Sequence, residues 1–84
     1  MSSREKLRAS KVLIETQAAI VKYILEQDDI INALKKEREQ FKERLGTDIF
    51  SDNFEKLIQV HNKAIDKAIE MLDEINKELG ILFN

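Results

Sequence analysis

Apolar residues recur at alternating steps of three and four positions along two long segments of the chain. Side chains three and four positions apart lie on one face of an α-helix, so each stripe is typical of a helix packed lengthwise against a partner helix. The first stripe comprises Leu13, Gln17, Ile20, Ile24, Gln27, Ile31, Leu34, Arg38, Phe41 and Leu45, and the second comprises Phe54, Ile58, His61, Ile65, Ala68, Leu72, Ile75, Leu79 and Leu82.

Few residues interrupt these two segments. The chain has no proline, and its two glycines are Gly46 and Gly80. Gly46 is suited to the left-handed cap that ends a helix, and Asp52 followed by Glu55 is an acidic variant of the capping box that begins one. We therefore expect a single domain over 1–84, with a helix over about 4–45, a turn over 46–52, a helix over about 53–79 and an apolar tail over 80–84.

A short turn between two long helices favours antiparallel neighbours, so the sequence predicts an all-α fold, a coiled-coil-like antiparallel two-helix hairpin. If Leu45 faces Phe54, Arg38 faces His61, and these are the most polar residues of their stripes. A slip of two residues would place Arg38 beside an apolar layer. We therefore interpret Arg38 and His61 as a pair that fixes the register.

This register leaves the start of the first helix, including Leu7 and Leu13, without cover from the second helix. Both helices also carry apolar residues away from the stripes, and such wide apolar faces suit two hairpins assembled into a four-helix bundle or one hairpin docked on a partner. Parallel association of two first helices through Gln17 and Gln27 is an alternative. The residues that we expect to bind a partner are Val12, Ile14, Val21, Leu25, Leu57, Ala64 and Met71.

Composition narrows the classes of partner. Charged residues make up 36% of the chain but the net charge is only −2, because acids and bases are interleaved, so we do not expect nucleic-acid binding. Neither a membrane-spanning run nor the apolar core of a signal peptide is present, and membrane binding is not expected either. Without cysteine, a reducing compartment fits, and we predict a cytoplasmic location.

No group of residues suggests catalysis. His61 is the only histidine, and the residue three positions before it is Ile58 rather than a carboxylate that would help to bind a metal. Asp28 and Asp29 are adjacent, so on a helix they point about 100° apart and cannot act as a catalytic pair. We predict no catalytic residue, no metal site and no cofactor, and expect that the protein is not an enzyme.

Two segments resemble known families of small helical chaperones. Lys63–Leu72, which follows a charged helix and a glycine-containing turn, resembles the small co-chaperones of type III secretion needle proteins. Gln27–Leu34 and the charged helix after it are similar to flagellar export chaperones. The resemblance implies a helical hairpin that covers an apolar helix of a client protein with its own apolar groove.

The sequence thus favours a protein-binding helical module, a small secretion chaperone or adaptor whose partner is another protein. The alternative is a self-contained, homo-oligomeric structural coiled coil of a phage or cellular assembly. In that case copies of the chain would cover the apolar residues, as in a dimer of hairpins.

Overall fold

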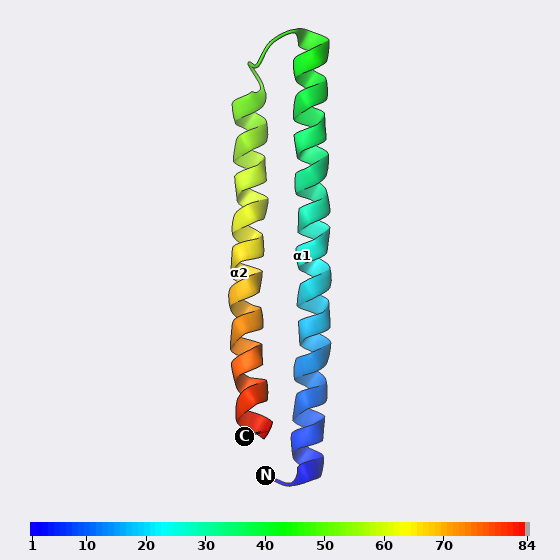
Figure 1. Cartoon of the computed structure of the whole chain (residues 1–84), viewed down its shortest axis with the longest axis vertical. Coiled ribbons are helices and arrows are strands. Elements are labelled where there is room, and N and C mark those ends of the chain that lie inside the picture. The colour runs from blue at the N-terminus through cyan, green and yellow to red at the C-terminus, as the bar shows by residue number, and fades with distance from the viewer. Residues whose placement is uncertain (84) are drawn as a thin grey trace.

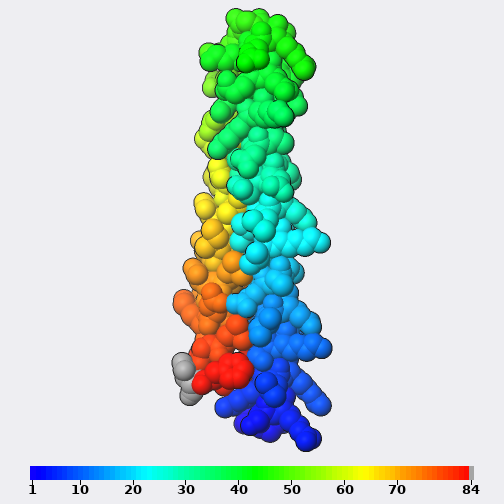
Figure 2. Space-filling model, turned by 45° about the vertical axis from the view of Figure 1, so that its right-hand side comes forward, coloured from blue at the N-terminus to red at the C-terminus, as the bar shows by residue number. Residues whose placement is uncertain are grey.

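The computed structural model describes residues 1–83 and contains two helices, α1 (Ser3–Leu45) and α2 (Ser51–Phe83). They lie side by side and run antiparallel, with both termini at one end, and α1 extends past α2 at each end (Figure 1). The molecule is a rod of 65 × 14 × 12 Å (Figure 2). The prediction of an all-α two-helix hairpin is confirmed, whereas assembly into a four-helix bundle stays a prediction.

Local signals define both ends of α1. The Ser2 side chain accepts a hydrogen bond from the backbone N–H of Glu5 at 3.2 Å, which caps the N-terminus. At the other end Gly46 adopts a left-handed conformation with φ of 62°, and its N–H donates to the carbonyl oxygen of Lys42 at 2.9 Å. The predicted helix over about 4–45 and its end at Gly46 are therefore confirmed.

The bounds of α2 differ from the prediction. It begins at Ser51, whose N–H donates to the carbonyl oxygen of Asp48 at 2.9 Å, and Glu55 binds Arg38 instead of closing a capping box. It also continues through Gly80 to Phe83, so the predicted end near Leu79 is wrong and residues 80–83 are helical; residue 84 lies outside the described residues. Burial against α1 outweighs the cost of about 1 kcal/mol for a glycine inside a helix.

The two predicted stripes face each other along the hairpin and form what we call the seam. Four of their residues, Ile20, Ile31, Ile58 and Ala68, are at most 8% exposed. The other apolar residues of the stripes are half-buried, because two helices alone cannot surround a core. The exceptions are Phe41 and Leu45, at 38% and 51% exposed.

Aromatic packing holds the turn. The Phe41 ring lies 5.9 Å from the Phe50 ring and 5.4 Å from the Phe54 ring, measured between centroids. The side chain of Phe41 therefore contacts the residues on either side of the start of α2. Such contacts place the first turn of α2 beside Phe41 rather than beside Leu45, so the last turn of α1 projects beyond its partner.

This placement changes the register along the whole seam. The residue numbers add up to 93 in the hydrogen-bonded pairs Gln17–Asn76 and Arg38–Glu55 and to 88 in the pair Gln27–His61, whereas the predicted register required about 99. The displacement is close to one heptad, which explains why the stripes still face each other although the opposing residues change.

The displacement also brings α2 closer to the N-terminus of α1. Ala9, Val12 and Leu13 line a shallow groove with Ile81 and Leu82, and Leu13 is half-buried. The expectation that α2 would not cover Leu13 is therefore wrong. Leu7, in contrast, remains exposed, as predicted.

Replacing Ile58 with alanine is expected to lower the free energy of unfolding by about 2–4 kcal/mol, because it removes a buried seam side chain. The matched control is Val60→Ala, since Val60 lies on the same helix but is 62% exposed. Its effect should be below about 0.5 kcal/mol. Urea titrations followed by circular dichroism at one fixed protein concentration would measure both; equal losses would contradict the assigned seam.

Candidate protein-binding faces

The polar residues of the seam are paired, but not as predicted. Nη1 of Arg38 donates to Oε2 of Glu55 at 2.8 Å, and Nδ1 of His61 donates to the side-chain oxygen of Gln27. The predicted register pair Arg38 and His61 is therefore wrong, because the displacement of nearly one heptad gives each residue a different neighbour.

A third polar pair lies nearer the N-terminus of α1, where Nε2 of Gln17 donates to Oδ1 of Asn76. Gln17 and Gln27, the residues that the alternative of parallel association would use, thus each hold α2 of their own chain. The three pairs are spread along the seam. Any slip of the helices would break all of them at once, so together they fix the register that one pair was expected to fix.

The exposed apolar residues lie on both sides of the seam. Residues two positions apart on a helix point about 200° apart, so Val21 and Tyr23 lie on opposite flanks of the seam. What we call the Val21 face consists of Leu7, Ile14, Ala18, Val21 and Leu25, all on α1. What we call the Tyr23 face consists of Val12, Ala19, Tyr23, Ile30, Leu57, Val60, Ala64, Met71 and Ile81, from both helices.

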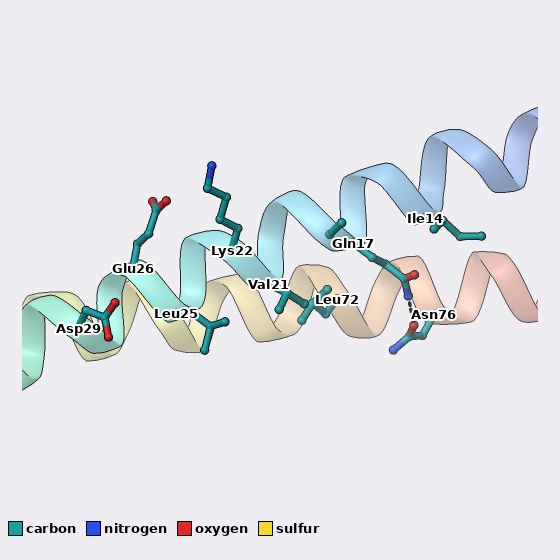
Figure 3. Close-up of a pocket in the computed structure, with 10 residues that line it drawn as sticks. Ile14, Gln17, Val21, Lys22, Leu25, Glu26, Asp29, Leu72 and Asn76 are labelled. Carbon is teal, nitrogen blue, oxygen red and sulfur yellow. Dashed lines mark hydrogen bonds between the residues drawn. The ribbon is translucent and has the colours of Figure 1, made fainter.

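On the Val21 face a shallow groove runs between α1 and α2. Figure 3 shows Val21 beside Leu72 and the Gln17–Asn76 hydrogen bond crossing between the helices. Lys22 and Glu26 lie at the edge of the groove with their charged ends turned away from Val21. Ile14 and Leu25 are 54% and 59% exposed, so more than half of each side chain contacts solvent. The floor of this groove is apolar, with one polar pair.

On the Tyr23 face two grooves follow one another along the hairpin. In the first, Ala19 and Tyr23 on α1 lie opposite Ala64 and Met71 on α2. The second, toward the termini, is the groove that Ile81 forms with α1. Small alanine side chains between larger apolar ones leave hollows that side chains of another helix can fill.

The structure divides the seven predicted partner-binding residues between these faces. Three belong to the Val21 face, namely Ile14, Val21 and Leu25, and four belong to the Tyr23 face, namely Val12, Leu57, Ala64 and Met71. They do not form one surface. The sequence reasoning missed Tyr23, Ala19 and Ile81, although their heptad positions beside the seam would have assigned them to the same side as Met71.

The side of each helix that points away from the seam carries charges. On α1 the outermost positions, which recur every seven residues, are Arg8, Glu15, Lys22, Asp29, Lys36 and Glu43, and on α2 they are Lys56, Lys63, Glu70 and Lys77. Acids and bases alternate on α1, which is typical of a solvated helix surface. Most of the exposed apolar residues of the two helices therefore belong to the two faces beside the seam, and Ile69, which is 44% exposed, belongs to neither.

Residues 1–83 contain no group of three or more histidine or acidic side chains placed to hold a metal ion. Over the same residues neither helix has an apolar stretch that could cross a membrane. Comparisons with protein families, with curated proteins and with solved structures found no match to the chain. Its function must therefore be inferred from the two faces and the charges beside them.

The hydrogen bond between Gln27 and His61 makes a specific prediction. Gln27→Leu should cost about 1–3 kcal/mol of stability, because it leaves the half-buried His61 ring without its partner. His61→Leu added to Gln27→Leu should recover most of this loss, since no unpaired polar group remains. Unfolding free energies of the two single variants and the double variant measure the coupling. Gln17→Leu with His61→Leu serves as the uncoupled control, and additive losses for the first pair would contradict the assigned contact.

Proposed function

We propose that the chain is a protein-binding helical module that covers an apolar helix of another protein, in the manner of a small secretion chaperone or adaptor. The observation that carries this proposal is the Tyr23 face, where both helices contribute exposed apolar side chains beside two grooves that follow one another along the hairpin. Met71 and Ile81 are 55% and 77% exposed on α2, and Val12 is 62% exposed on α1. Exposed apolar surface of this extent marks an interaction site.

An amphipathic helix is the partner structure that fits such a groove best. A third helix laid between two antiparallel helices inserts its side chains, spaced three and four residues apart, between theirs. Ala19 and Ala64 provide the hollows, and Tyr23 and Met71 provide large contacts on either side. Methionine adapts to partners of different shape, which suits a chaperone.

The edges of the Tyr23 face are polar. Lys67 borders the groove opposite Ala19, and Glu78 borders the groove formed by Ile81. An apolar centre with a polar edge is the usual composition of an interface that forms and dissociates. The helix of a client would thus bury its apolar side and keep its charged side in water.

The second candidate function is a homo-oligomeric structural coiled coil of a phage or cellular assembly. The observation that favours it is that apolar residues flank the seam on both sides, so copies of the hairpin can pack on the Val21 face and on the Tyr23 face together. Such an assembly would leave no groove for a client. The two functions therefore differ in whether the Tyr23 face is free in the purified protein.

Met71→Asp is expected to weaken client binding by tenfold or more, because it places a charge in the centre of the Tyr23 face. Ile69→Asp is the matched control, since Ile69 is exposed on the same helix but lies away from this face. Quantitative pull-downs from source-cell extract with wild type and both variants would identify proteins lost only with Met71→Asp. Calorimetry with a peptide of the identified client helix would give the affinities.

Equal binding of that peptide by wild type and by Met71→Asp would contradict the client proposal. A purified protein that forms a large oligomer, and that dissociates when Met71 is replaced, would instead support the homo-oligomeric function. Circular dichroism of each variant would verify that the hairpin remains helical.

A further inference from the structure

The Val21 face has a charge at each end of its apolar centre. The residues Ile14, Ala18, Val21 and Leu25 follow one another at steps of three and four, and the same spacing continues to Lys11 on the N-terminal side and to Asp28 on the C-terminal side. The face is thus apolar in the middle, basic at one end and acidic at the other.

Such a stripe is complementary to itself when it is turned end for end. With the twofold axis midway between Ala18 and Val21, Ala18 of one copy lies opposite Val21 of the second copy. Ile14 then lies opposite Leu25, and the stripe continues with Lys11 opposite Asp28 at both ends. Between Lys11 and Asp28 each apolar residue of the stripe meets an apolar residue and each charge meets its opposite, whereas Leu7, farther toward the N-terminus, lies opposite Asn32.

The same face in a parallel pair would be unfavourable, because Lys11 would lie opposite Lys11 and Asp28 opposite Asp28. In the single chain the nearest acid to Lys11 is Glu15 on the same helix, at 3.9 Å and with both side chains mostly exposed. Asp28 makes no ion pair within residues 1–83. Both charges are therefore available to a second copy.

Space at the centre of the face also permits close approach of two helices. The alanine at position 18 has a small side chain, and opposite Val21 it allows the helix axes to approach to about 8–10 Å. Lys22 and Glu26 lie at the edge of the groove, and their charged ends turn away from Val21 (Figure 3).

We propose that the Val21 face is the interface of an antiparallel homodimer, in which α1 packs on α1 of a second copy with Lys11 opposite Asp28. This interface lies on the opposite side of the seam from the Tyr23 face. It leaves the client groove open and does not depend on the proposed function.

Charge reversal tests the pairing in the full chain. Sedimentation equilibrium over a concentration series should give a dimer for wild type. Lys11→Glu alone and Asp28→Lys alone should each raise the dimer dissociation constant by tenfold or more, since each creates like-charge contacts at both ends. The double variant should return to within about threefold of wild type, because it restores opposite charges with the signs exchanged. The matched controls Lys36→Glu and Glu43→Lys, at outer positions of α1, should change little.

Cysteine cross-linking tests the direction of packing, and the chain contains no natural cysteine. A mixture of Ile14→Cys and Leu25→Cys proteins should form a mixed disulfide on oxidation. Each variant alone should not, because in the antiparallel pair the two copies of either residue lie about 16 Å apart along the helix. A disulfide needs Cα atoms within about 7 Å. Mass spectrometry distinguishes the products.

Three results would overturn the homodimer proposal: a wild-type monomer at all concentrations, disulfides formed readily by either single variant alone, or a dimer that does not respond to the charge reversals. A monomer that binds a client through the Tyr23 face would leave the proposed function intact. A dimer that responds to the charge reversals but binds no client would support the homodimer proposal and contradict the proposed function.

Discussion

The structure depends on the seam between α1 and α2, because two helices have only one shared surface to bury. Four apolar side chains in it are nearly inaccessible to solvent, and the rest are half-buried except Phe41 and Leu45, which are exposed. Hydrophobic burial along such a seam is nearly the same at each heptad displacement, so it stabilises the hairpin without selecting one register. The polar pairs make the selection, since Gln17, Gln27 and Arg38 each have one partner on α2.

The sequence was sufficient to predict the features that depend on local chemistry. The stripes, the end of α1 at Gly46 and the antiparallel arrangement all follow from helical periodicity, cap geometry and a short turn. The register could not be predicted in this way, because displacing one helix along the other by about one heptad leaves apolar positions facing apolar positions. It is decided by contacts between the helices that periodicity does not encode, namely the three polar pairs and the packing of Phe41 on Phe50 and Phe54. Gly80 stays helical for a similar reason, since neighbouring residues pack on α1.

The predicted partner-binding residues illustrate a different limit. All were identified from their apolar character away from the stripes, and most are exposed. Hydrophobicity does not say on which flank of the seam a residue lies, however, and that depends on its heptad position. Ile14 and Val12 differ by two positions and therefore belong to different faces. Which residues of the two helices oppose each other is therefore a separate question from which flank of the seam a residue lies on. Sequence periodicity could answer only the question of the flank.

The two faces differ in a way that bears on their partners. The Val21 face takes its apolar residues from α1 alone and ends in charges of opposite sign, which makes it complementary to a reversed copy of itself. The Tyr23 face is built by both helices, and its borders carry Lys67 and Glu78 on α2, without a comparable symmetry. A twofold interface requires that a surface match itself, whereas a groove for a client requires only that it match a helix. The self-complementary face therefore suits the second copy, and the asymmetric groove suits a different protein.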